Sequence, residues 1–112
     1  MNQRQFDSCI EACHSCATAC DECASACLKE DDVTMMARCI ALDIDCAHLC
    51  RAAAGFMARG SQFARALCQV CADVCDACGE ECARHQAAHC QACSQTCRRC
   101  ADECRRMVAT AA

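Results

Sequence analysis

The spacing of the cysteines constrains the fold of this chain more than any other feature of its sequence. From Cys9 to Cys27, successive cysteines are separated by 4, 3, 4, 3 and 4 positions. Steps of three and four residues return to one face of an α-helix, so the spacing predicts a helix with a single stripe of thiols. The stripe occupies the a and d positions of a heptad repeat, where leucine usually lies in a helical bundle. Its members are Cys9, Cys13, Cys16, Cys20, Cys23 and Cys27.

Similar stripes occur in three further segments, which predicts three more helices. The connections between the segments are short and polar, so neighbouring helices should run antiparallel. We therefore expect an all-α fold, an antiparallel four-helix bundle with a cysteine-lined core, formed as a single domain by residues 1–112. The expected helices span roughly 3–29, 32–57, 61–85 and 88–109. The further stripes are Cys39, Cys46 and Cys50; Cys68, Cys71, Cys75, Cys78 and Cys82; and Cys90, Cys93, Cys97, Cys100 and Cys104.

The composition explains why thiols would have to fill this core. Leucine, isoleucine, valine and phenylalanine together number only 14, too few for an ordinary hydrophobic core. A protonated thiol packs like a small apolar group, so the 19 cysteines supply the missing volume. If filling were their sole role, leucine and isoleucine would share the a and d positions with them. The regularity of the stripes therefore indicates metal binding.

Charge and hydropathy exclude several classes of partner and indicate a compartment. The net charge is −4, and basic residues alternate with acidic ones, so we expect no nucleic-acid partner. The sequence contains neither a secretory signal nor an apolar run long enough to cross a membrane, so we expect a soluble, cytoplasmic protein without a membrane partner. An odd number of cysteines cannot pair completely, and the cytosol is reducing, so structural disulfides are not expected.

Thiolates at helical spacing suit monovalent copper. Side chains three or four positions apart on a helix have Cβ atoms about 5–6 Å apart. With metal–sulfur bonds of about 2.3 Å, two sulfurs on opposite sides of one ion lie roughly 4.6 Å apart. One helix can therefore hold a two-coordinate ion, and a thiolate from a neighbouring helix can make the ion three-coordinate. Soft thiolate ligands select Cu(I).

The charge of a filled core favours Cu(I) over divalent metals. Each thiol that binds a metal loses its proton, and many uncompensated anions in a dry interior would be prohibitively costly. One Cu(I) for each thiolate leaves no net charge, whereas Zn(II) with four thiolates leaves two negative charges at each site. We therefore expect a capacity on the order of 10 to 20 Cu(I) ions.

Other functions remain open at this point. A general soft-metal buffer for zinc or cadmium would use the same cysteines. A redox or electron-transfer protein is a further alternative, although it would need one exposed, activated pair of cysteines. The loop motif of bacterial iron–sulfur proteins is absent from the sequence.

The residues that continue the stripes beyond their last cysteine predict the two ends of the bundle. His85 and His89 follow Cys82 by steps of three and four, and Asp43 occupies the missing position between Cys39 and Cys46. Together with Met36 they should form a weaker, more exchangeable site for loading and release of ions. Alternatively, the histidines face solvent, Asp43 is bonded to the backbone, and Met36 fills the core without binding metal. The opposite end should be an apolar plug. It would contain Phe6, Met57 and Met107 with Phe56 or Phe63, while His14 and His48 should lie on the surface.

The stripes and the ending HCQACSQTCRRCADECRRM resemble the bacterial copper storage proteins of the cytosolic type. The resemblance covers nearly the whole chain. It implies a four-helix bundle that stores many Cu(I) ions, associates as a homotetramer, and has histidine and carboxylate ligands at an open end, a role that His85, His89 and Asp43 match. The methionine-rich mouth of exported members is represented at most by Met35 and Met36. We therefore interpret the chain as a storage or detoxification protein for copper, and not as an enzyme. Its predicted metal ligands are the cysteines given above together with His85, His89 and Asp43.

Overall fold

Four long helices account for most of the chain. The structure is a computed structural model that describes residues 4–110, and in that part of the chain it contains no β-strand. A short 3₁₀-helix, η1 (Val33–Met36), precedes the second long helix. The long helices are α1 (Arg4–Cys27), α2 (Ala37–Ala58), α3 (Ala64–Ala83) and α4 (Ala88–Thr110).

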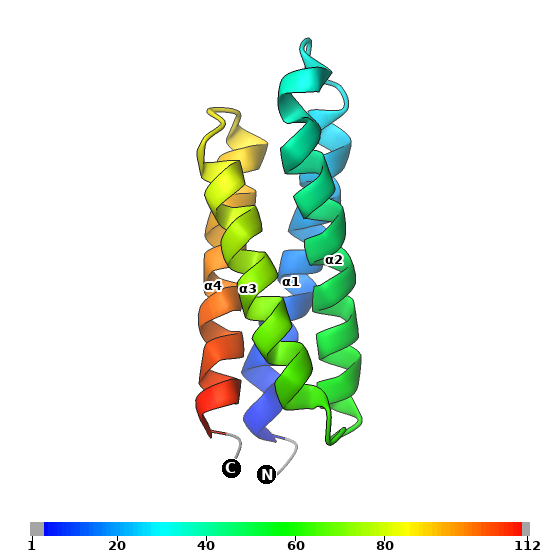
Figure 1. The fold of residues 1–112 in the computed structure, drawn as a ribbon, viewed down its shortest axis with the longest axis vertical. Coiled ribbons are helices and arrows are strands. Elements are labelled where there is room, and N and C mark those ends of the chain that lie inside the picture. The colour runs from blue at the N-terminus through cyan, green and yellow to red at the C-terminus, as the bar shows by residue number, and fades with distance from the viewer. Residues whose placement is uncertain (1–3, 111–112) are drawn as a thin grey trace.

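The helices form a square bundle in which α1 packs against α2 and α4, and α3 packs against the same two helices. The bundle measures 47 × 18 × 17 Å. Figure 1 shows the connections α1–α2 and α3–α4 at one end and the connection α2–α3 at the other. We call these the histidine end and the apolar end, after the residues described below. The prediction of an antiparallel four-helix bundle is confirmed.

At the apolar end, the turn between α2 and α3 differs from the expected one. Gly60 has a φ of 63°, which a glycine adopts without strain. The amides of Gly60 and Ser61 donate to the carbonyls of Met57 and Phe56 at 3.0 and 2.9 Å, which ends α2 in a Schellman motif. Because the Ser61 hydroxyl accepts from the amide of Phe63 at 3.0 Å, the chain makes a further turn there. Helix α3 consequently begins at Ala64, three residues later than expected.

At the histidine end, both connections are short. The carboxylate of Asp32 accepts a hydrogen bond from the amide of Met35 at 3.3 Å and caps η1. The residues at which the second helix was expected to begin therefore form a 3₁₀ turn instead. Helix α3 ends at Ala83, and α4 begins at Ala88 after a turn at 84–87. The predicted break in helical structure between the third and fourth stripes is therefore confirmed.

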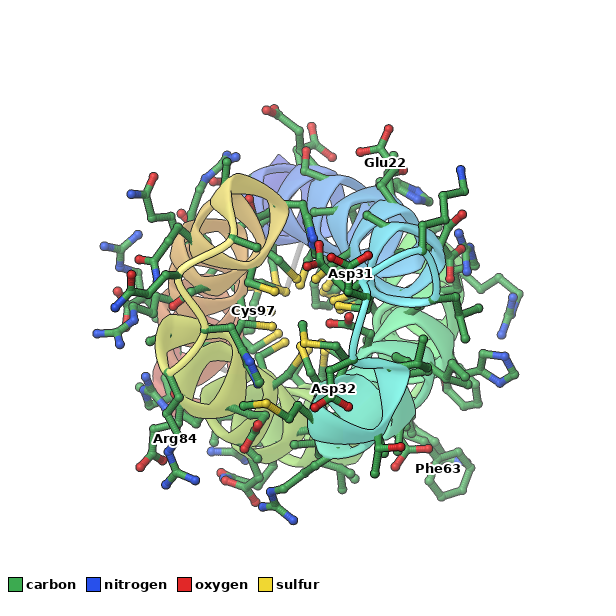
Figure 2. The ribbon with its side chains drawn as sticks, turned by 90° about the horizontal axis from the view of Figure 1, so that it is seen from above. Glu22, Asp31, Asp32, Phe63, Arg84 and Cys97 are labelled. Atoms are coloured by element: carbon green, nitrogen blue, oxygen red, sulfur yellow. The ribbon has the colours of Figure 1, made fainter. Side chains whose placement is uncertain are left out.

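The core consists of the four cysteine stripes, which all face the bundle axis. Every one of the 19 cysteines is at most 1% exposed, and all are free thiols. Figure 2 looks along the bundle from the histidine end and shows the sulfurs gathered around the centre, with Cys97 among them, while Arg84 and Phe63 lie on the outside. Alanines beside the stripes are also buried and bring the helices close together: Ala12, Ala17, Ala47, Ala53, Ala54, Ala72 and Ala101.

Candidate metal centre

The sulfur atoms of the four stripes form one connected column. Between helices, the Sγ atoms of Cys39 and Cys82 lie 3.4 Å apart. Cys46 lies 3.7 Å from Cys16 on α1 and 3.5 Å from Cys75 on α3. Such contacts link each stripe to its neighbours, so the thiols form a continuous array and not separate pairs.

Groups of four thiols within this column are close enough to share a metal ion. In each group the four sulfurs lie within 4.8 Å of one another. Three sulfurs around one ion at about 2.3 Å would be about 4.0 Å apart, and two on opposite sides about 4.6 Å apart, so both arrangements fit. Neighbouring groups share members, which would let one thiolate bridge two ions. Five of these groups are Cys13/Cys71/Cys100/Cys104, Cys16/Cys46/Cys50/Cys75, Cys16/Cys20/Cys46/Cys97, Cys20/Cys78/Cys93/Cys97 and Cys23/Cys27/Cys39/Cys90.

Burial favours the protonated form of Cys27 and Cys90, two of the outermost thiols of the column, in the metal-free protein. It raises the pKa of Cys27 to about 11, and burial followed by the nearby Cys39 raises the pKa of Cys90 as well. Metal binding at these thiols must therefore release protons.

Asp43 lies inside the column, on α2, and is fully buried. Its Oδ1 accepts bonds from the thiols of Cys78, Cys93 and Cys82 at 3.1, 3.4 and 3.6 Å. Burial, and then the nearby Cys93, raises its pKa to about 8. The carboxyl group is thus bonded to thiols, and not to the backbone as in the alternative considered from the sequence.

His89 contacts the thiols directly. The stripe of the third helix was extended through His85 to His89, but His89 lies in the first turn of α4, one position before Cys90 and within the range 88–109 expected for the fourth helix. Its Nδ1 lies 3.5 Å from the sulfur of Cys90, 3.6 Å from Cys23 and 3.9 Å from Cys27. Its Nε2 lies 3.0 Å from the carboxylate of Glu30. The imidazole therefore joins the outermost group of thiols to the α1–α2 connection.

His85 lies just beyond the end of α3, with its Nε2 2.9 Å from Oε2 of the buried Glu81. The guanidinium groups of Arg38 and Arg84 lie 3.2 and 3.4 Å from the other oxygen of Glu81. His85 also lines a hollow of about 230 Å³ at the histidine end, and Figure 2 shows Asp31 and Asp32 beside the central opening there. The other residues of the hollow are Glu30, Met35, Met36, Gln86 and Ala87.

The two carboxylates that contact the histidines were missed in the sequence. Glu81 lies four positions before His85, a spacing that brings side chains together in a helix and could have revealed the pair. Glu30 is distant from His89 in the sequence, and no local signal connects them.

The apolar end contains the expected plug. Phe6, Met57 and Met107 are buried, and of the two candidates Phe56 and Phe63 it is Phe56 that packs, partly buried, against the core. Phe63 is 57% exposed, because the extra turn before α3 carries it out of the bundle. His14 and His48 are exposed on the surface, as expected.

Fold and site together define a class of protein, a helical bundle whose cysteine-lined core can hold several soft metal ions. Residues 2–109 match the sequence profile of the copper storage proteins. The chain therefore belongs to the copper storage protein family, as predicted from its sequence. Among residues 4–110, no helix combines the length and the hydropathy needed to span a membrane.

Solved structures of copper storage proteins have the same fold. The Cu(I)-bound protein BsCsp3 of Bacillus subtilis has 43% identity and a TM-score of 0.90, over 93% of this chain and 98% of its own. A cytosolic copper storage protein of Streptomyces lividans loaded with five coppers has 42% identity and a TM-score of 0.92, over 96% of this chain and 94% of its own. Ccsp of the same organism, loaded with 10 copper equivalents, has 43% identity and a TM-score of 0.91, over 95% of this chain and 85% of its own.

Proposed function

We propose that this protein stores multiple Cu(I) ions on the thiolates of its core. The observation that carries the proposal is the continuous column of buried thiols, in which groups of four sulfurs lie within 4.8 Å of one another. Thiolates select Cu(I), and overlapping groups allow ions to fill the column with shared ligands. Cu(I)-bound relatives with the same fold support this assignment.

The proposed ligands are all 19 cysteines, with Asp43, His85 and His89 at the histidine end. Because one Cu(I) for each thiolate leaves no net charge, we expect a capacity on the order of 10 to 20 ions. Ions load at the histidine end, since His89 touches the outermost thiols there while Phe6, Met57 and Met107 close the other end.

The proposal extends to the protein's surroundings. We place it in the cytoplasm, a location supported by the cytosolic relative from Streptomyces lividans.

We also propose that it is a homotetramer of single-domain subunits and has no enzymatic activity. Exposed apolar side chains on α2 and α3 offer a surface for self-association. They are Ile44 on α2, Phe63 just before α3 and Val70 on α3. Light scattering at several protein concentrations tests the oligomeric state.

A general buffer for zinc or cadmium is the second candidate. Groups of four thiols also suit a tetrahedral divalent ion, which is the observation in its favour. Each such site would retain two negative charges in a dry core, so repeated filling would become progressively harder.

An anaerobic titration of the reduced, metal-free protein separates the two candidates. Cu(I) is added in competition with a high-affinity chelator, and Zn(II) is titrated in parallel. Storage predicts tight binding beyond about ten copper equivalents, with early or weak saturation by zinc. Replacing Cys46 and Cys75, neighbours at 3.5 Å, by serine should lower the copper capacity, whereas an Ala47→Ser control should not. Saturation at one to four coppers, or stronger binding of zinc, would contradict the proposal.

A further inference from the structure

Each of the two histidines at the histidine end is paired with a carboxylate through the same ring nitrogen. Nε2 of His89 lies 3.0 Å from Oε2 of Glu30, and Nε2 of His85 lies 2.9 Å from Oε2 of Glu81. An ionised carboxylate can only accept a hydrogen bond, so each Nε2 must carry the hydrogen. In a neutral imidazole, Nδ1 is then left with a free lone pair.

The free nitrogen of His89 faces the outermost thiols. Its Nδ1 lies between 3.5 and 3.9 Å from the sulfurs of Cys90, Cys23 and Cys27. In the opposite tautomer, Nε2 would have no hydrogen and its lone pair would face the carboxylate of Glu30. The carboxylate therefore decides which nitrogen is available on the side of the thiols.

The second carboxylate is held more firmly than the first. The Glu81 side chain is only 9% exposed, and Arg38 and Arg84 flank its Oε1, which leaves Oε2 for His85. Glu30 is 41% exposed and lies at the start of the α1–α2 connection. Carboxylates that accept from a metal-binding histidine are known to fix its tautomer and ring orientation, and to make it a stronger ligand.

We propose that Glu30 and Glu81 are positioning residues that hold His89 and His85 with the hydrogen on Nε2, so that each Nδ1 is free to receive Cu(I). The inference deepens the proposed function and rests on it for the identity of the ion. The arrangement of hydrogens, however, is a property of the metal-free protein and can be measured without copper.

The first experiment measures the tautomers by ¹⁵N NMR of the reduced, metal-free protein labelled at histidine. Spectra are recorded at about pH 8 to 9, where an ordinary imidazole is neutral. We expect both His85 and His89 to carry the hydrogen on Nε2. In Glu30→Gln, the amide can donate as well as accept, so His89 alone should become a mixture of tautomers. Glu81→Gln should change His85 alone. A hydrogen on Nδ1 of either histidine in the unmodified protein would overturn the assignment for that pair.

The second experiment measures the initial rate of Cu(I) uptake from a chelator. We expect each Gln variant to load about tenfold more slowly, with the final copper capacity unchanged. Glu22→Gln and Glu80→Gln are the controls, because each removes one negative charge from the half of the bundle nearer the histidine end, on α1 and α3, and the described structure gives neither side chain a hydrogen bond or ion pair with a histidine. Uptake by Glu30→Gln and Glu81→Gln at the rate of these controls would overturn the inference. Failure of the unmodified protein to bind copper would instead refute the proposed function, while the NMR result would stand.

Discussion

The two ends of the bundle differ although the same cysteine stripes extend toward both. The buried polar residues of the described chain are Asp43, Glu81 and Ser94, and all three lie in the half nearer the histidine end. The apolar end is closed by Met57 and other large side chains. The thiols thus provide the core throughout, while the polar residues make one half sensitive to pH and open to ligands.

The largest expected effect is a loss of stability of the metal-free protein as the pH rises. The pKa of Asp43 is raised from about 4 in an unfolded chain to about 8 in the fold. Between these values the folded protein binds the extra proton, so its contribution to stability is complete below about pH 4 and is lost as the pH rises to about 8. We expect a slope of about −1.4 kcal/mol per pH unit within this window, measured by denaturant unfolding of reduced protein.

Asp43→Asn is the matched variant, since the amide has nearly the same shape and does not titrate. The difference in the free energy of unfolding between the two proteins should be independent of pH below about pH 4 and above about pH 8. Between these values it should change steadily. Parallel stability curves for both proteins from about pH 4 to 8 would show that another group is responsible.

The next largest effect should be found at the apolar end. Met57 is completely buried, so Met57→Ala leaves a closed cavity and should lower the free energy of unfolding by about 3 kcal/mol. Met36 at the histidine end borders the open hollow, which water can enter, so Met36→Ala should cost only about 1 kcal/mol. Denaturant unfolding of the metal-free variants measures both values. Equal losses would mean that the two ends are packed equally tightly.

The regular spacing of the cysteines was sufficient to predict the bundle, because a stripe at helical period fixes both the helix and its buried face. It also predicted that Asp43 points inward, since Asp43 occupies a position of the stripe on α2. The sequence did not reveal that this carboxyl group would be bonded to thiols of α3 and α4, because that contact depends on how three helices meet.

The outcomes for His89 and Phe63 show what the register of a stripe leaves open. His89 was correctly expected near the outermost thiols and within the range of the fourth helix, but the third stripe was extended to it through a turn that begins at Arg84. Phe56 and Phe63 were the two candidates for the last member of the plug, and Phe56 packs against the core while the turn after Gly60 delays the start of α3 and leaves the ring of Phe63 exposed. Both outcomes are decided in connections, where local hydrogen bonds set the path of the chain and the stripe gives no information.

A third prediction concerns the rate of copper uptake at the two ends. His85→Ala combined with His89→Ala removes both imidazoles from the histidine end, and the initial uptake of Cu(I) should become at least about tenfold slower. Met107→Leu at the apolar end conserves volume and should leave the rate unchanged. Stopped-flow transfer from a coloured chelator measures both rates. Slower uptake in Met107→Leu alone would place the loading route at the apolar end.

The smallest effect tests how closely the helices approach near the histidine end. The hydroxyl of Ser94 on α4 donates to the carbonyl of Gly79 on α3 at 2.9 Å. A Cβ atom at Gly79 would lie 3.3 Å from Cβ of Cys97 and 3.5 Å from the carbonyl oxygen of Ser94. Overpacking costs about 1–3 kcal/mol, and alanine recovers about 1 kcal/mol through its helix propensity. We therefore expect Gly79→Ala to lower the free energy of unfolding by about 1 kcal/mol. A gain in stability would mean that α3 and α4 can separate slightly, and that close packing there is not required.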